Sequence, residues 1–153
     1  MSAAFLFVMV TIIISSAATV VVAFHPRSHH HHHHHHPTIR IINLDRDTER
    51  WRNIQRQFQG GVKSAEKKNI HRLPAVYGKA LSPKDLQTNA TLLARAFCTP
   101  GMIGCYLSHR TFWQSVAEES TTVPYQIVLE DDAVIQCANS NEFFECIKEA
   151  VQE

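Results

Sequence analysis

The sequence predicts an α/β fold with a mainly parallel sheet, and three observations support this prediction. Segments rich in β-branched residues alternate along the chain with segments of helical periodicity. Residues typical of turns and helix caps separate these segments. A cluster of carboxylates follows the last predicted strand directly, at the sheet edge where open α/β folds bind ligands. We therefore expect one ligand-binding α/β domain from Thr38 onward.

The first half of this domain is predicted to be a strand, a helix, a second strand and a further helix. Residues 38–44 follow a proline and are rich in β-branched side chains, which is typical of a strand. Asp47 is the expected cap of the next segment and Gly60-Gly61 its end. Apolar residues recur there at helical spacing: Trp51, Ile54 and Phe58. Residues 70–76 form the second predicted strand, and Ser82-Pro83 marks the next helix start.

The second half is predicted to be a long helix, a short strand and a last helix. The long helix follows Pro100, and five residues lie along one side of it: Ile103, Tyr106, Arg110, Trp113 and Ala117. The apolar stripe of the helix is wide and is expected to pack on the sheet. Residues 126–129 form a short apolar strand. The last helix starts at Asn139 or Asn141 and has one apolar face: Phe144, Ile147 and Val151.

The N-terminal segment resembles a targeting sequence. Residues 3–24 carry no charge and are long enough to cross a membrane as a helix. Residues 21–23 fit the small-residue pattern of a signal-peptidase site, so residues 1–24 are interpreted as a signal peptide or a signal anchor. Both interpretations place the domain in the lumen of the endoplasmic reticulum or Golgi, soluble or attached to the membrane. Residues 23–26 also resemble the junction of a bipartite plastid leader, which leaves the plastid as the alternative.

A histidine run, residues 29–36, lies in a linker of residues 25–37. Such a tract does not fold, chelates transition metals and gains charge as the pH falls through about 6.5. It fits an inserted purification tag and a natural low-complexity stalk equally well. Because a flexible tract has no fixed geometry for orienting a substrate, we do not expect it to be a catalytic metal site.

Charge and cysteine content narrow the possible partners. The chain of 153 residues carries 15 Lys and Arg against 14 Asp and Glu, and Arg27 is the one Lys, Arg, Asp or Glu before Thr38. The folded part is therefore formally neutral, which excludes nucleic acid as the main partner. The four cysteines contain no Cys-x-x-Cys pair, so a structural zinc site is not expected. In an oxidising lumen they could form disulfides in three pairings, or they could stay free.

The three consecutive carboxylates are the most informative feature. Glu130, Asp131 and Asp132 are bracketed by apolar residues at the end of a predicted strand. Like charges packed together repel one another and need a compensating cation, and their hard oxygen ligands suit Mg²⁺ or Mn²⁺. An anionic ligand bridged by such a metal fits this site. The alternative is an acidic surface turn in solvent.

Three sequence blocks in order resemble those of glycosyltransferase family 25, which includes bacterial lipopolysaccharide galactosyltransferases and collagen hydroxylysine galactosyltransferases. The blocks are residues 42–50, residues 101–109 with Trp113 after them, and residues 127–133. A shorter similarity covers residues 74–78. The resemblance implies a GT-A-like, Rossmann-type half-domain over residues 38–153. Because the chain ends at Glu153, shortly after the acidic block, the domain is apparently truncated at its C-terminus.

The resemblance also implies an activity. It is the transfer, with inversion, of a sugar, usually galactose, from a UDP-sugar to an acceptor hydroxyl on a glycan, lipopolysaccharide or protein. By similarity to the Asp-x-Asp motif of this fold, Glu130 and Asp132 would hold Mn²⁺ or Mg²⁺, with Asp131 as the alternative ligand. The nucleotide-sugar-binding residues would be Asn43, Asp45, Arg46, Ser108, His109, Glu130 and Asp131. The general base is not assigned, because the acceptor side of the family is expected beyond this segment.

Several of these residues have simpler structural explanations. Asp45 and Arg46 could form a solvated turn or a local ion pair, Ser108 could bond back to its own helix, and His109 could be a hydrogen-bonded core residue. Two rival functions accordingly stay open: an inactive or truncated nucleotide-sugar-binding module, and a lumenal metal-binding protein built around the histidine run. Residues 89–91 form an N-glycosylation acceptor sequence, which matters only if the domain is lumenal.

Overall fold

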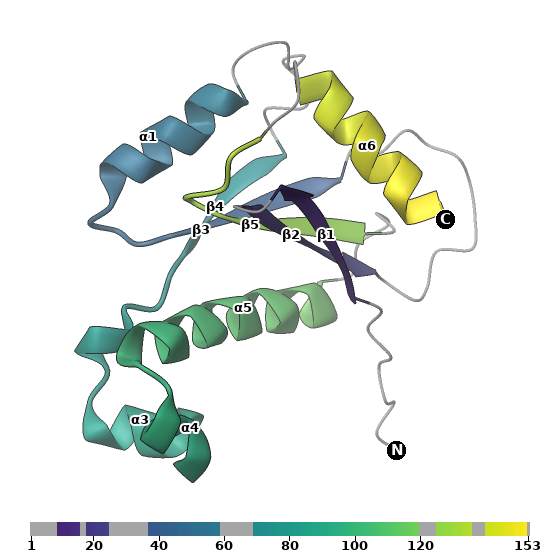
Figure 1. The fold of residues 1–153 in the computed structure, drawn as a ribbon. Helices are drawn as coiled ribbons and strands as arrows, with labels where there is room; N and C mark the ends of the chain where they lie inside the picture. Colours follow the sequence, from purple (N-terminus) through teal and green to yellow (C-terminus); the bar gives the residue numbers. More distant parts are fainter. Residues whose placement is uncertain are drawn as a thin grey trace.

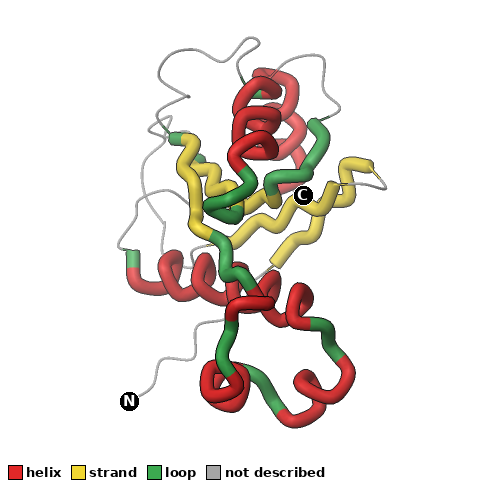
Figure 2. Tube along the Cα trace, turned by 90° about the vertical axis from the view of Figure 1, so that its left-hand side faces the viewer, coloured by secondary structure: helices red, strands yellow, loops and turns green. Residues whose placement is uncertain are grey.

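The computed structural model describes residues 9–15, 18–24, 37–58, 69–119, 125–135 and 140–152. Its strands are β1 (Met9–Ser15), β2 (Ala18–Phe24), β3 (Thr38–Asn43), β4 (Ile70–Pro74) and β5 (Tyr125–Glu130). The helices are α1 (Thr48–Gln57), α3 (Pro83–Asn89), α4 (Leu92–Phe97), α5 (Pro100–Glu118) and α6 (Ser140–Gln152), with the 3-10 helix η1 (Gly78–Ala80). Helices α1 and α6 cover one face of the sheet and α5 covers the other (Figure 1). Figure 2 shows the same layers after a turn of 90°.

The sheet has the strand order β1-β2-β5-β3-β4. Strand β3 pairs in parallel with β4 on one side and with β5 on the other. These three strands, with helices between them in sequence, confirm the predicted α/β class and form the parallel part of a partial GT-A, Rossmann-like domain. On the far side of β5 the pairing becomes antiparallel, first with β2 and then from β2 to β1.

Strands β1 and β2 lie within the segment that was predicted to be a signal peptide or a signal anchor. The run contains Ile12-Ile13-Ile14 and Val20-Val21-Val22, and β-branched residues favour extended backbone because their χ1 angles are restricted. In the described part of the chain, no helix is both long and apolar enough to cross a membrane. The signal peptide or anchor and the histidine run also include residues 1–8, 16–17 and 25–36, which lie outside the described residues, so these interpretations stay predictions.

The alternation of side chains along β3 and β5 divides the core into two clusters. Ile39 and Ile41 of β3 face α1 and α6, whereas Ile42 faces α5. The first cluster is completed mainly by Ile54, Phe58, Tyr125, Ile127, Leu129, Phe143, Phe144 and Ile147. The second cluster is completed by Leu73, Phe112, Val116 and Val128. Because Glu130 continues the face of Val128, its side chain lies on the α5 side.

The buried side of helix α5 overlaps only in part with the predicted one, since Ile103 is buried and Trp113 packs against the second cluster as expected. Its buried residues are Ile103, Gly104, Leu107, Ser108, Phe112 and Val116, whereas Tyr106 is 53% exposed and Ala117 is exposed. The reason is a close approach of two backbones. A Cβ atom on Gly104 would lie 2.6 Å from the carbonyl oxygen of Val76 and 2.7 Å from the Gly78 nitrogen. The small residues of α5 therefore turn toward the β4–η1 connection, which a search for large apolar residues overlooks.

Helices α1, α3 and α6 start where the sequence predicted, but the expected cap of α1 does not form. Asp47 stands at the N-cap of α1 as predicted, but its side chain makes no capping hydrogen bond and lies 3.6 Å from Arg46 Nε. Ser82 and Asp85 form a complete capping box at α3. Helix α6 starts at Ser140, between the two predicted asparagines, and buries Phe144 and Ile147 as predicted. The side chain of Val151 lies outside the described residues.

The cysteines of the described residues are unpaired. Cys98, Cys105 and Cys146 are free, and Cys137 lies outside the described residues. Asn89 of the glycosylation acceptor sequence lies at the end of α3, where its Nδ2 donates to the Asp85 carbonyl oxygen at 3.1 Å.

Candidate functional site

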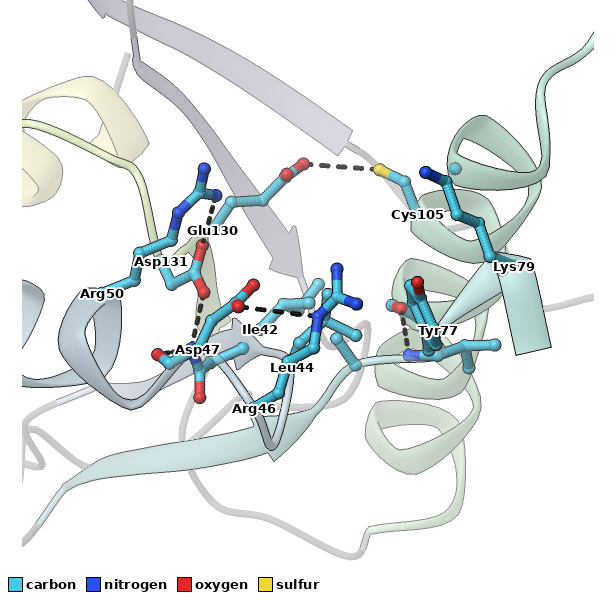
Figure 3. Close-up of a pocket in the computed structure, with 16 residues that line it drawn as sticks. Ile42, Leu44, Arg46, Asp47, Arg50, Tyr77, Lys79, Cys105, Glu130 and Asp131 are labelled. Atoms are coloured by element: carbon cyan, nitrogen blue, oxygen red, sulfur yellow. Dashed lines mark hydrogen bonds and ion pairs between the residues drawn. The ribbon is translucent and has the colours of Figure 1, made fainter.

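A pocket of about 250 Å³ lies at the carboxyl ends of β3 and β5, beside α5 (Figure 3). This is the edge of the sheet at which the sequence predicted ligand binding. Polar and charged side chains from four parts of the chain line it: Asn43, Arg46, Asp47, Arg50, Lys79, Cys105, Ser108, Glu130 and Asp131. The backbone between Ala75 and Gly78 closes the side opposite the acidic turn.

The carboxylates of the acidic turn diverge. Glu130 points toward α5, where its Oε1 lies 3.1 Å from His109 Nε2 and 3.5 Å from Cys105 Sγ. The hydrogen bond with His109 holds the pKa of Glu130 below its ordinary value, against the opposite effect of burial. Figure 3 shows Glu130 directed to Cys105, while Asp131 is directed away from them.

Asp131 is engaged within the protein. Its Oδ2 accepts a hydrogen bond from Asn43 Nδ2 at 2.6 Å, and its Oδ1 lies 3.4 Å from Arg50 NH1. Its side chain is only 10% exposed, and its backbone N–H donates to the Ile42 carbonyl oxygen at 3.1 Å. The charge of Asp131 is thus balanced by Arg50 of α1 and by the hydrogen bond from Asn43 of β3. Asp131 therefore has a structural role at the edge of the pocket.

Asp132 differs from both of its neighbours. Its side chain is 61% exposed, and its contact with Arg50 NH1 is long, at 3.8 Å. It lies just outside the lining of the pocket. Its carboxylate is therefore the one in the turn that solvent reaches most easily.

Asn43 connects the pocket to β4. It is 2% exposed, and its Oδ1 accepts from Arg72 Nε at 2.7 Å while its Nδ2 also donates to the Asp47 carbonyl oxygen at 3.0 Å. Arg72 also pairs with Asp45 at 2.7 Å, and the Asp45 side chain is 85% exposed and outside the pocket lining. Asp45 is therefore solvent-exposed and forms its ion pair with the distant Arg72, whereas Arg46 lies 3.6 Å from Asp47.

Three cationic side chains face the pocket. Arg46 lies over the ring of Tyr77, with its guanidinium carbon 4.1 Å from the ring centroid, a cation–π contact. Arg50 approaches Asp131 and Asp132, as described above. Lys79 is exposed, and within the described part of the chain no carboxylate forms an ion pair with it. The pocket therefore offers both positive and negative groups to a ligand.

Ser108 holds α5 against the pocket wall. Its Oγ donates to the Gly104 carbonyl oxygen at 2.8 Å and accepts from the Val76 N–H at 2.9 Å. The predicted bond back to its own helix is confirmed, and the bond to Val76 adds a second contact. Since Ser108 is 1% exposed, its hydroxyl shapes the pocket by positioning the backbone of residues 76–78.

The pocket gathers some of the predicted site residues and leaves others at its margin. Its lining includes Asn43, Arg46, Ser108, Glu130 and Asp131 and does not include Asp45, His109 and Asp132. Four residues to which the sequence assigned no role also line it: Arg50, Tyr77, Lys79 and Cys105. Three of them fell within the family-like blocks, but Lys79 had no signal beyond its place after Gly78. The predicted roles in binding the nucleotide sugar stay predictions.

The fold and pocket define an α/β protein with a pocket of polar and charged side chains at the carboxyl ends of its parallel strands. Residues 36–153 match the family model of glycosyltransferase family 25, described as an LPS biosynthesis protein. The match covers most of the chain, so the chain belongs to glycosyltransferase family 25. No curated protein and no solved structure matched the chain. Family membership implies a nucleotide-sugar donor and an acceptor that receives the sugar.

Proposed function

We propose that this protein transfers a sugar, with galactose the expected one, from a UDP-sugar to an acceptor hydroxyl on a glycan, lipopolysaccharide or protein. Family membership supports the reaction class. The observation that carries the proposal is the pocket at the carboxyl ends of β3 and β5, where acidic and cationic side chains lie together. A nucleotide diphosphate bridged to carboxylates by a divalent ion needs both kinds of group.

The cationic side of the pocket suits the diphosphate. Arg46, Arg50 and Lys79 line it, and Lys79 is exposed and without an ion pair among the described residues. An ammonium group that is free of a protein partner can approach a phosphate without first breaking a contact. Arg50 would also offset the charge of Asp131 and Asp132 while the donor is absent.

The acidic side offers oxygen ligands that fit Mn²⁺ or Mg²⁺. Such ions are commonly held by one or two carboxylates together with substrate phosphates. Asp132 and Glu130 are the accessible pair, with side chains 61% and 46% exposed, whereas Asp131 already bonds to Asn43 and Arg50. When bound there, the ion would neutralise the charge that develops on the leaving UDP. We therefore assign the metal to Asp132 and Glu130 and a supporting role to Asp131.

Substitution of Asp132 by asparagine tests this proposal. Asp132→Asn keeps the size of the side chain and removes its charge, so we expect Mn²⁺-dependent UDP binding to be lost with little change in stability. Isothermal titration of UDP into the full chain, with Mn²⁺ and with a chelator, measures this loss. Glu118→Gln, an exposed charge change at the end of α5, is the matched control and should bind UDP normally. Unchanged binding by Asp132→Asn would contradict the metal assignment.

Turnover separates transfer from binding alone. The full chain is incubated with UDP-galactose and Mn²⁺, and UDP release is measured with and without candidate acceptor sugars. Release that depends on Asp132 supports the transferase. Tight UDP binding without any release would instead identify a nucleotide-sugar-binding module.

A further inference from the structure

Three potential metal ligands of different chemistry meet beside the pocket. Cys105 and His109 are four residues apart on α5, so their side chains emerge from the same side of the helix. Glu130 reaches them from the end of β5. One ligand atom from each residue lies within 4.8 Å of the other two, and no other group of three or more such residues was found among the described residues.

Two of the three distances between these atoms are close to those around a tetrahedral ion. Zinc binds cysteine sulfur at about 2.3 Å, histidine nitrogen at about 2.0 Å and carboxylate oxygen at about 2.0–2.2 Å, which separates neighbouring ligand atoms by about 3.3–3.6 Å. In the structure, Glu130 Oε1 lies 3.1 Å from His109 Nε2 and 3.5 Å from Cys105 Sγ. Side-chain rotation could therefore bring all three ligand atoms onto one ion.

We propose that Cys105, His109 and Glu130 bind Zn²⁺ through three protein ligands, leaving a fourth position open to water or a ligand. Thiolate and imidazole favour Zn²⁺ over Mn²⁺ and Mg²⁺, which take oxygen ligands. This site is therefore chemically distinct from the carboxylate site proposed at Asp132, although both include Glu130. The site was not predicted, because the chain contains no Cys-x-x-Cys pair and the third ligand is distant along the sequence.

The environment of Cys105 supports metal binding. The side chain is exposed and lines the pocket, so an ion can reach it from solvent. Without a metal ion, its thiol donates a hydrogen bond to Glu130 Oε1 at 3.5 Å. Binding of Zn²⁺ would release that proton to solvent and replace the hydrogen bond with two metal–ligand bonds.

Residue-resolved alkylation tests the site in the full chain. Each cysteine is labelled with iodoacetamide with and without Zn²⁺, and labelling is followed by peptide mass spectrometry. We expect Zn²⁺ to slow labelling of Cys105 by at least about tenfold, because a metal-bound thiolate is a poor nucleophile. Cys98 and Cys146, which belong to no such cluster in the described residues, should label equally with and without Zn²⁺. A histidine run is also expected to chelate Zn²⁺, so the readout is the protection of Cys105 and not the total zinc taken up.

Two variants complete the test. His109→Gln removes one ligand and should abolish the protection of Cys105, whereas His71→Gln, on the exposed edge of β4, should leave it intact. A thiolate-to-Co²⁺ charge-transfer band should appear when Co²⁺ is added to the full chain, and it should be lost in Cys105→Ser but kept in Cys98→Ser. Equal labelling of Cys105 with and without Zn²⁺, or equal protection in His109→Gln, would overturn the proposal. No nucleotide is present in these assays, so their outcome is independent of the proposed transferase.

Discussion

The side-chain amide of Asn43 donates to Asp131 Oδ2 at 2.6 Å and thereby joins the carboxyl ends of β3 and β5. The same amide donates to the Asp47 carbonyl oxygen, and its oxygen accepts from Arg72. One buried side chain therefore holds together two strands, the start of α1 and β4. The position of Asp131, and with it the direction of the acidic turn, depends on this residue.

Removal of the Asn43 side chain should destabilise the fold. Asn43→Ala removes the hydrogen bonds from the Asn43 side chain to Asp131 and from Arg72 to the Asn43 side chain, at a site that is 2% exposed. We expect the free energy of unfolding to fall by about 1–3 kcal/mol, since buried polar groups would lose hydrogen bonds. Urea denaturation measures the change. Asp45→Asn, on the exposed side of Arg72, should change stability by no more than about 0.5 kcal/mol.

Two glycines of α5 should respond to alanine in opposite ways. A Cβ on Gly104 would lie 2.6 Å from the Val76 carbonyl oxygen and 2.9 Å from the Gly78 Cα, both backbone atoms. Gly104→Ala should therefore cost about 1–3 kcal/mol in the free energy of unfolding. Gly101→Ala meets nothing nearer than 3.8 Å and is expected to be neutral or stabilising, by up to about 1 kcal/mol. Similar effects of the two changes in thermal denaturation would argue against the close approach.

Lys79 should contribute to binding of the donor. If its ammonium group contacts the diphosphate, Lys79→Ala should weaken UDP binding about tenfold, or about 1.4 kcal/mol. The loss should diminish as salt concentration rises, because the interaction is electrostatic. Titration calorimetry at two salt concentrations checks both expectations. Lys84→Ala, an exposed lysine of α3 outside the pocket, is the control, and equal affinities for the two variants would exclude a specific contact by Lys79.

Glu119 should make stability depend on pH. Burial alone would raise the pKa of Glu119, but hydrogen bonds from Gln126 and Arg40 and the charge of Arg40 outweigh it, so the pKa is lowered in the folded state. A lowered pKa adds stability above the ordinary value of 4.5 and loses it as pH falls through the folded-state value. The Arg40–Glu119 ion pair is partly exposed to solvent, so Glu119→Gln should lower the free energy of unfolding by only about 0.5–1 kcal/mol at pH 7.

Measuring the stability of Glu119→Gln at several pH values tests whether the pKa of Glu119 is lowered or raised in the folded state. Its difference from the unmodified chain in the free energy of unfolding should shrink when the pH is lowered well below 4.5. Glu118→Gln changes the exposed neighbouring charge and should differ little at either pH. A difference that grows in acid would mean that Glu119 carries a raised rather than a lowered pKa.

The order β3, α1, β4, α3, α5, β5, α6 was predictable because it depends on local patterns, whereas β1, β2, η1 and α4 were not predicted. β-branched runs, helical spacing and the Ser82–Asp85 capping box act over a few residues, so the sequence alone was enough to place β3, α1, α3, α5 and β5. The acidic turn after β5 was predictable for the same reason. The family could be identified because each of its sequence blocks is a continuous stretch of the chain.

The direction of each side chain was decided only by tertiary structure. The sequence presents three adjacent carboxylates as one cluster, whereas in the fold Glu130 turns to His109 and Cys105, Asp131 to Asn43, and Asp132 to solvent. These partners come from elements far apart in the chain, and no local pattern encodes which of them will meet. The buried side of α5 likewise depends on the approach of Gly104 to Gly78, where the absence of side chains lets two backbones come into contact.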